Sequence, residues 1–125
     1  MSSNDTNGMA DTIRRYVSLL ATGSADDLLE LFADDATVED PVGSDVRTGR
    51  REIHPFFSAL EAMERHTELG LLRIVGREAA FTFTISFTVG DSQMSLQPID
   101  TMTFNASGQI TSVRSYFDSS DVATL

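Results

Sequence analysis

Apolar and polar residues alternate most clearly between residues 79 and 89 of the chain. The apolar row consists of Phe81, Phe83, Ile85, Phe87 and Val89, and threonine and serine stand between its members. Because successive side chains of a strand point to opposite faces, this segment is predicted to be a β-strand with one face against a core. Turn signals such as Gly76 and Gly90 separate it from further predicted strands, which cover residues 66–75, 93–104 and 109–117.

Helical spacing dominates the first half of the chain. Residues 9–21 are predicted to form a helix that ends at Gly23, and Ser24 can cap a second short helix. The apolar face of the first helix is Met9, Ile13, Tyr16, Val17 and Leu20. Residues 50–64 suit a third helix, in which Pro55 is tolerable only near the first turn. Helices followed by long strands indicate an α+β fold, with three helices on one face of a curved, mostly antiparallel sheet that can enclose an apolar pocket.

Three polar side chains fall on predicted apolar faces. In "LQPIDTMTF", the row of alternate apolar positions contains Asp100, and Pro98 marks a bulge or an edge. In "ATVEDPVGS", a short strand leads into a turn, and Asp40 shares its face with alanine and valine. Tyr16 lies on the apolar face of the first helix. Taken singly, each has an ordinary explanation: a core tyrosine, an aspartate that starts a turn, and a buried aspartate with a hydrogen-bonded or ionic partner.

Together, these three side chains suggest acid–base chemistry. An unpaired carboxyl that is buried raises its pKa and stays protonated, so Asp100 would be a hydrogen-bond donor at neutral pH. Tyr16 is a second donor, and two donors that converge in an apolar pocket form an oxyanion hole. An ionised Asp40 would then serve as a general base. Two carboxyls with pKa values pushed apart by their environments are expected for this division of roles.

Composition narrows the class of ligand. The chain has 125 residues, 41% of them hydrophobic, which predicts one globular domain over residues 9–125. The polar opening segment "MSSNDTNG" is expected to be a flexible leader over residues 1–8. The formal net charge of −10 disfavours nucleic acids and anionic membranes, and leaves a neutral or cationic small molecule. The absence of cysteine and of a long apolar run fits a cytoplasmic protein without membrane insertion. His54 and His66 are expected to be solvated or structural rather than metal ligands.

Four segments carry a family resemblance. "RYVSLL", "ELFADDATVEDPVGS", "EAAFTFTISF" and "QPIDTMTFN" together closely resemble bacterial Δ5-3-ketosteroid isomerases of the NTF2-like superfamily. The resemblance implies an NTF2-like (cystatin-like) cone, in which Tyr16 and Asp100 are oxyanion-hole donors and Asp40 is the proton-shuttling base. The implied reaction moves the double bond of a 3-oxosteroid from Δ5 to Δ4 without cofactor or metal. A carboxylic acid kept neutral so that it can donate is an established feature of this family.

The resemblance also bears on the steroid cleft. It implies substrate contacts for Phe57, Phe83, Met102 and Phe117, for each of which ordinary core packing is the alternative. Family members often extend the phenol into a network of tyrosines, whereas Phe32 and Phe57 occupy those positions here. Tyr16 would therefore lack hydroxyl support, and Tyr116 is expected to face away from Phe117.

Further expectations concern assembly and alternative functions. The family implies a homodimer packed through its sheets. Two other functions stay open from the sequence. One is an NTF2-like isomerase, cyclase or dehydratase that acts on another polycyclic ketone, and the other is a non-catalytic domain that only binds an apolar ligand.

Overall fold

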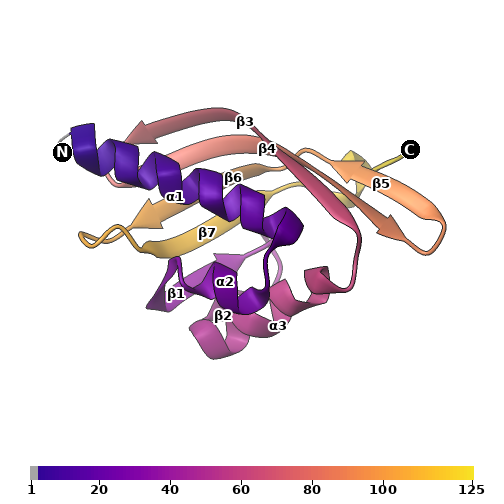
Figure 1. Ribbon diagram of the computed structural model, residues 1–125, viewed down its shortest axis with the longest axis horizontal. Helices are drawn as coiled ribbons and strands as arrows, with labels where there is room; N and C mark the ends of the chain where they lie inside the picture. The colour runs from indigo at the N-terminus through magenta and orange to yellow at the C-terminus, as the bar shows by residue number, and fades with distance from the viewer. Residues whose placement is uncertain (1–2) are drawn as a thin grey trace.

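The computed structural model describes residues 3–125 and has the predicted α+β architecture (Figure 1). The helices are α1 (Ser3–Thr22), α2 (Ala25–Leu29) and α3 (Arg50–Glu61), with a 3₁₀ turn at Ser119–Asp121. The strands are β1 (Phe32–Glu39), β2 (Arg47–Thr48), β3 (Arg65–Val75), β4 (Glu78–Val89), β5 (Ser92–Leu96), β6 (Ile99–Phe104), β7 (Ile110–Tyr116) and β8 (Ala123–Thr124). None of the described helices is long and apolar enough to cross a membrane.

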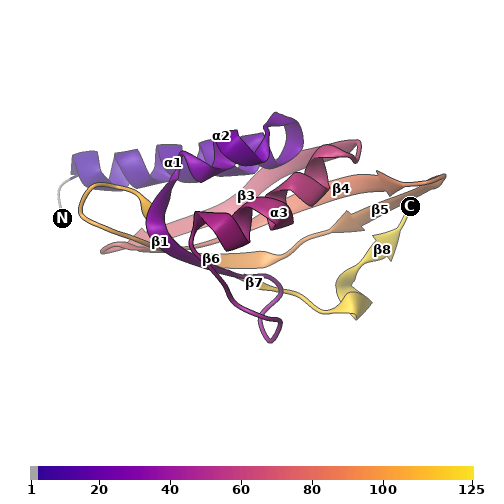
Figure 2. The ribbon, with the colours of Figure 1, turned by 90° about the horizontal axis from the view of Figure 1, so that it is seen from below.

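All the described strands belong to one curved sheet, and the three helices lie on one side of it (Figure 2). The strand order is β2-β1-β7-β6-β4-β5-β8, and β3 pairs with β4 on a separate branch. The β1–β7 pair is parallel, and the other pairs are antiparallel. Helix α1 packs along β3, while α3 packs against β1 and β2. The core therefore fills the space between the helices and the inner face of the sheet.

The predicted strand over residues 93–104 is in fact two strands, β5 and β6. Pro98 lies between them, and the break follows because proline has no N–H for a ladder. Strand β4 pairs with β6 through its first half and with β5 through its second half. The inward row predicted for this segment is confirmed: its buried members are Leu96, Pro98, Asp100, Met102 and Phe104.

Two boundaries differ from the sequence-based expectation. Helix α1 begins at Ser3 rather than at residue 9, so most of the polar leader is helical; residues 1 and 2 lie outside the described part of the chain. No apolar residue repeats before Met9 to reveal this turn, although Asp5 in the first turn favours the helix dipole. Strand β1 begins at Phe32, where the chain pairs with Ile110 of β7, a contact between distant residues that local periodicity cannot show.

The predicted Ser24 cap of α2 is confirmed, whereas Pro55 lies farther into α3 than the first turn. The Ser24 hydroxyl accepts a hydrogen bond from the Asp27 N–H, and the Asp27 carboxylate accepts one from the Ser24 N–H, each at 3.1 Å. This capping box starts α2. In α3, Pro55 lies in the second turn, where it removes one helical hydrogen bond. Burial of Ile53 and Phe57 against the core holds α3 in place, each contributing roughly 1.5–3 kcal/mol.

Candidate active site

A cavity of about 190 Å³ opens between the helices and the sheet. It is lined by Tyr16, Leu20, Asp40, Phe56, Leu60, Met63, Phe83, Ile85, Phe87, Leu96, Pro98, Ser115 and Phe117. Only Tyr16, Asp40 and Ser115 bring polar side chains to this wall. Asp100 is directly opposite Ser115 in the β6–β7 pair, so its carboxyl lies beside the cavity rather than on the lining. The structure thus places Tyr16 and Asp40 on the wall of an apolar cavity and Asp100 next to that wall.

Asp100 is a carboxyl without a partner. Its side chain is 1% exposed, and neither carboxyl oxygen has a hydrogen-bond partner among residues 3–125. Its pKa is raised to about 7, mainly by burial; the nearby Ser115 hydroxyl opposes this rise, and the charge of Asp40 adds to it. The Ser115 hydroxyl is close enough to act electrostatically, but it does not reach hydrogen-bond geometry. Asp100 is therefore mainly protonated below about pH 7. In that form, its O–H has no acceptor in the described protein.

Asp40 has a lower pKa than Asp100. Burial raises its pKa to about 6, and the positive charge of Arg47 opposes that rise. The neighbouring Glu39 behaves in the opposite way: the Gly43 N–H and the Arg114 guanidinium lower its pKa. Glu39 at the end of β1 and Asp40 directly after it thus occupy different electrostatic environments. Between pH values of about 6 and 7, Asp40 is mainly ionised while Asp100 is mainly protonated.

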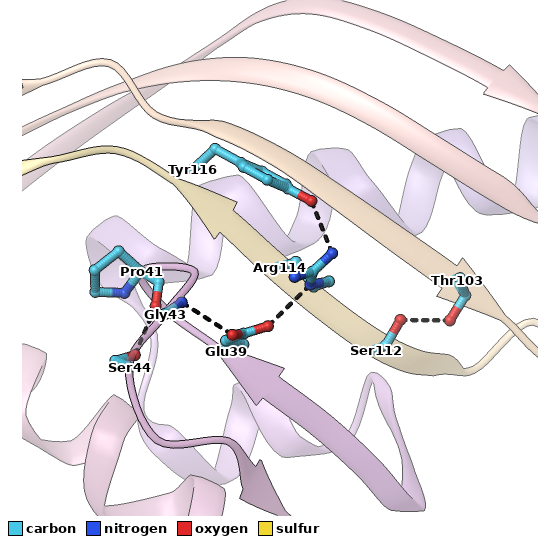
Figure 3. A network of polar contacts seen from close by, with 8 residues as sticks. All are labelled: Glu39, Pro41, Gly43, Ser44, Thr103, Ser112, Arg114 and Tyr116. Atoms are coloured by element: carbon cyan, nitrogen blue, oxygen red, sulfur yellow. Dashed lines mark hydrogen bonds and ion pairs between the residues drawn. The ribbon is translucent and has the colours of Figure 1, made fainter.

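The turn after Asp40 is held by a polar network (Figure 3). The Glu39 carboxylate accepts a hydrogen bond from the Gly43 N–H at 2.9 Å and one from Arg114 Nε at 2.9 Å. The Ser44 hydroxyl donates to the carbonyl of Pro41 at 2.6 Å. The "EDPVGS" segment thereby orients Asp40 toward the cavity, because its polar neighbours satisfy one another on the outer face.

The phenol of Tyr16 is set among aromatic rings. Its ring centroid lies 6.2 Å from that of Phe32 and 6.2 Å from that of Phe57, both at edge-to-face angles. Burial raises the pKa of Tyr16 above its ordinary value, and the charges of Asp100 and Asp40 raise it further. Within the described part of the chain, its hydroxyl has no hydrogen-bond partner, as the two phenylalanines predict. Tyr16 is therefore a neutral donor that faces the cavity.

The predicted substrate-contact residues divide into two groups. Phe83 and Phe117 line the cavity, whereas Phe57 and Met102 are each 1% exposed and lie outside its lining. Phe57 packs against Tyr16 within the core, so ordinary core packing describes both of these side chains in the structure. Tyr116 faces the outer side of the sheet, where its hydroxyl accepts a hydrogen bond from Arg114 at 2.9 Å (Figure 3).

Several cavity residues were not predicted from the sequence. The cavity lining also includes Leu20 of α1, Phe56 and Leu60 of α3, and Met63, which follows α3. Ile85, Phe87 and Leu96 come from strands of the sheet, and Pro98 lies between β5 and β6. Phe56 and Phe57 are adjacent and both apolar, so the sequence does not show which of them lines the cavity. The rotation of α3 about its own axis, relative to the core, decides that it is Phe56. For the sheet residues, the alternation of apolar and polar positions in residues 81–89 and 96–104 indicates which side chains face inward.

Arg65 holds the two helix ends that border the cavity. Its guanidinium donates to the carbonyl of Leu20 through Nε, to that of Gly23 through Nη2 at 2.9 Å, and to those of Leu60 and Met63 through Nη1 at 2.6 and 3.2 Å. These carbonyls belong to the ends of α1 and α3, where helices leave acceptors unsatisfied. No local pattern marks this residue, since Leu20 and Gly23 lie more than 40 residues away from it in the sequence.

The buried Asp100 should make stability depend on pH. The pKa of this carboxyl is about 7 in the folded chain, whereas the ordinary value of 3.8 applies to the unfolded chain. The folded chain therefore binds more protons between these values and loses stability as pH rises. For Asp100→Asn, the free energy of unfolding relative to the wild type should increase by about 2 kcal/mol between about pH 5.5 and about pH 8.5. Urea denaturation followed by circular dichroism measures this difference. Asp91→Asn in an exposed turn is the control, and a pH-independent difference for Asp100→Asn would contradict the burial of an unpaired carboxyl.

Residues 3–125 contain no group of three or more histidine, aspartate or glutamate side chains placed to hold a metal ion. His54 Nε2 lies 3.2 Å from an Asp26 carboxylate oxygen, and His66 Nε2 lies 3.9 Å from a Glu64 carboxylate oxygen. Both histidines are on the surface and outside the cavity lining. Neither histidine therefore contributes to the cavity wall.

Comparisons with known proteins identify the family of the chain. Residues 13–113 match the family model of the SnoaL-like domain. The chain is 44% identical over 110 residues to a steroid Delta-isomerase from Nocardioides simplex, and the match covers 88% of this chain and 89% of that protein.

Two solved structures share the fold. One is SalBIII, an epoxide hydrolase/cyclase-like enzyme in pyran ring formation in the polyether salinomycin, with a TM-score of 0.90 and 26% identity over 97% of this chain and 98% of that one. The other is RV0760c from Mycobacterium tuberculosis, with a TM-score of 0.86 and 18% identity over 94% of this chain and 96% of that one. The sheet and helices described above are thus an NTF2-like arrangement.

Proposed function

The chain belongs to the SnoaL-like family of the NTF2-like superfamily, and from this premise we propose that it is a steroid Δ-isomerase. It moves the double bond of a 3-oxo-Δ5-steroid to the Δ4 position. The similarity to the isomerase from Nocardioides simplex spans most of both chains. The structural observation that carries the proposal is the buried Asp100, whose oxygens have no partner, next to a cavity that contains a second carboxyl, Asp40.

Asp40 acts as the base in this mechanism. Its carboxylate takes the acidic proton from C4 of the steroid, which converts the ketone into a dienolate. The resulting carboxylic acid returns the proton at C6, and the dienolate collapses to the conjugated ketone. One proton leaves the carbon skeleton and one returns, so the reaction needs no external acid or oxidant. The raised pKa of Asp40, about 6, places the base near working pH, where proton transfer is most effective.

Tyr16 and Asp100 stabilise the oxygen of the dienolate. The O–H of protonated Asp100 has no acceptor among the described residues, so an oxygen of the substrate supplies the missing partner. The phenol of Tyr16 is also free to donate, because Phe32 and Phe57 offer it no hydrogen bond. Donors fixed in an apolar environment stabilise developing charge more than donors in water do.

The cavity suits one end of a steroid. Its volume of about 190 Å³ is smaller than the roughly 300–1,000 Å³ of pockets that enclose a drug-sized ligand. We infer that the ring with the carbonyl group enters toward Tyr16 and Asp40, while the far rings lie near the mouth. Phe56, Met63 and Phe87 line the cavity and provide apolar contacts for the steroid rings.

Incubation of the protein with a 3-oxo-Δ5-steroid should produce the conjugated Δ4 enone. The reaction is followed by the rise of ultraviolet absorbance that conjugation causes, and a phenolic steroid, which mimics the dienolate, should compete with the substrate. A heat-denatured sample is the control. An absorbance rate no greater than that of the denatured sample would exclude this function.

A second candidate function is supported by the similarity of the fold to that of SalBIII, an epoxide hydrolase/cyclase-like enzyme. The same carboxyls and phenol could act on another polycyclic ketone with an acidic neighbouring C–H. Failure of phenolic steroids to bind would favour this candidate, whereas binding of steroids without turnover would indicate a domain that only holds an apolar ligand. The inward-facing acid–base groups favour the two catalytic functions.

The assembly and location stay predictions. We propose a homodimer that forms through the outer face of the sheet. Ile99 and Tyr116 are both exposed there and lie opposite each other in the β6–β7 pair, and Leu71 and Val75 of β3 are also exposed. Such apolar side chains support an interface between sheets. A cytoplasmic location follows only from the composition.

A further inference from the structure

Arg47 is a cation close to the cavity that the mechanism has not used. It belongs to the short strand β2 and pairs with Val38, two residues before Asp40 on β1. Its guanidinium carbon lies 4.4 Å from the centroid of the Phe56 ring. Phe56 and Asp40 both line the cavity, so Arg47 stands at the edge of the wall that contains the base.

In the described part of the chain, the guanidinium of Arg47 is held without a carboxylate partner. Its Nη1 is buried and has no hydrogen-bond partner within residues 3–125. Among the ion pairs of the described chain, none joins Arg47 to Asp40. Stacking on the Phe56 ring compensates part of the lost hydration, because the face of an aromatic ring attracts a cation. The positive charge therefore stays near Asp40 without occupying its carboxylate oxygens.

This arrangement has a chemical consequence for a base. A direct ion pair would stabilise the carboxylate but also occupy the oxygens that must take the proton. A cation farther away still stabilises the negative charge through the low-dielectric wall and leaves those oxygens open. We propose that Arg47 is a positioning residue that keeps the Asp40 carboxylate ionised and free to react. This inference deepens the proposed function and rests on it for its catalytic meaning.

The other charged groups around Asp40 act in the opposite direction or face elsewhere. Asp100 on β6 and Tyr16 on α1 both interact with the charge of Asp40, and neither is a cation. Glu39 and Arg114 pair on the outer face. Among residues 3–125, Arg47 is the charged group whose effect lowers the pKa of Asp40 against that of burial.

Helix α3 packs against β1 and β2, and its charged side chains Arg50, Glu52 and His54 contact partners other than Asp40. The Glu52 carboxylate accepts a hydrogen bond from the Thr48 N–H at 3.1 Å, and His54 lies 3.2 Å from Asp26. Arg50 donates to the carbonyl of Phe32 at 2.9 Å. Substitution of Arg47 thus isolates the effect of one charge on Asp40.

The direct test is a titration of the Asp40 carboxyl carbon by ¹³C nuclear magnetic resonance, which needs no turnover. In Arg47→Gln, the midpoint of Asp40 should move upward by about half a pH unit or more, roughly a threefold change in its proton equilibrium. Arg47→Met, which retains apolar packing on Phe56, should give the same shift. Arg47→Lys, which retains the charge, should keep the wild-type midpoint within about 0.2 pH units.

Arg73→Gln is the matched control, because it removes one positive charge from an exposed position outside the cavity lining. It should leave the Asp40 midpoint unchanged. An unchanged midpoint in Arg47→Gln and Arg47→Met would overturn the inference, as would equal shifts in Arg47→Lys and Arg47→Gln, which would indicate packing rather than charge.

The same variants separate this inference from the proposed function. If the wild type is an isomerase, the acid limb of its kcat/KM profile should move upward in Arg47→Gln together with the resonance midpoint. A resonance shift in a protein without isomerase activity would exclude the function while confirming the effect of Arg47 on Asp40. An active enzyme whose acid limb stays fixed in Arg47→Gln would exclude the role of Arg47 and leave the function intact.

Discussion

Replacing Asp40 with asparagine should lower kcat for the Δ5-to-Δ4 isomerisation roughly 10²–10⁴-fold, the usual contribution of a general base. The amide has nearly the shape of the carboxyl but cannot take the proton from C4. The KM should change little, because the apolar wall that binds the steroid is retained. The rate is measured from the ultraviolet absorbance of the conjugated product.

Two measurements make the Asp40 result decisive. Asp45→Asn, in the exposed loop that follows the turn, removes the same charge outside the cavity and should stay within about twofold of the wild type. A phenolic steroid should still bind to Asp40→Asn, which shows that the pocket is folded. If Asp40→Asn turns over as fast as the wild type, Asp40 is not the base.

Asp100→Leu should lower kcat by roughly 10²–10³-fold, because it removes one donor to the dienolate oxygen. Asp100→Asn should lose much less, since its amide N–H₂ still donates in the same place. Leucine also fills the buried site without leaving an unpaired polar group, so its loss of activity reports the missing donor rather than instability. Equal losses in the two variants would argue against a donor role for Asp100.

The pH profile offers a second readout for the same residue. The wild type needs Asp40 ionised and Asp100 protonated, so its kcat/KM should rise through a pKa of about 6 and fall through a pKa of about 7. These are values for a coupled pair of carboxyls. In Asp100→Asn, the alkaline limb should disappear, because the amide does not titrate, while the acid limb remains. An alkaline limb that persists unchanged would assign it to another group.

The two carboxyls show how a site can reduce the stability of the fold that carries it. A buried carboxyl without a partner costs stability once it is ionised, and a phenol without a partner costs some as well. In this protein, the aromatic packing of Tyr16 with Phe32 and Phe57 and the capping of helix ends by Arg65 surround the site. The unsatisfied donors persist because the substrate is the partner that they lack.

Much of the fold was predictable from local patterns. Alternation in residues 79–89 places Phe81 and Phe83 inside, and the structure buries both. The Ser24 cap and the inward row from Leu96 to Phe104 are likewise confirmed. The two errors have different causes. Strand β1 begins early because it pairs with the distant β7, which local periodicity does not show. Pro98 divides one expected strand into two because it has no N–H for a ladder.

The sequence by itself determined the faces on which Tyr16, Asp40 and Asp100 lie, because the direction of a side chain follows from the period of its own helix or strand. Only the tertiary structure decided that Phe56 rather than Phe57 lines the cavity, since that depends on how α3 is rotated against the sheet. The difference between the two aspartate pKa values also arose there. This difference in pKa depends on burial by other helices and strands and on the charge of Arg47. The spacing of residues within one helix or strand does not reveal such contacts.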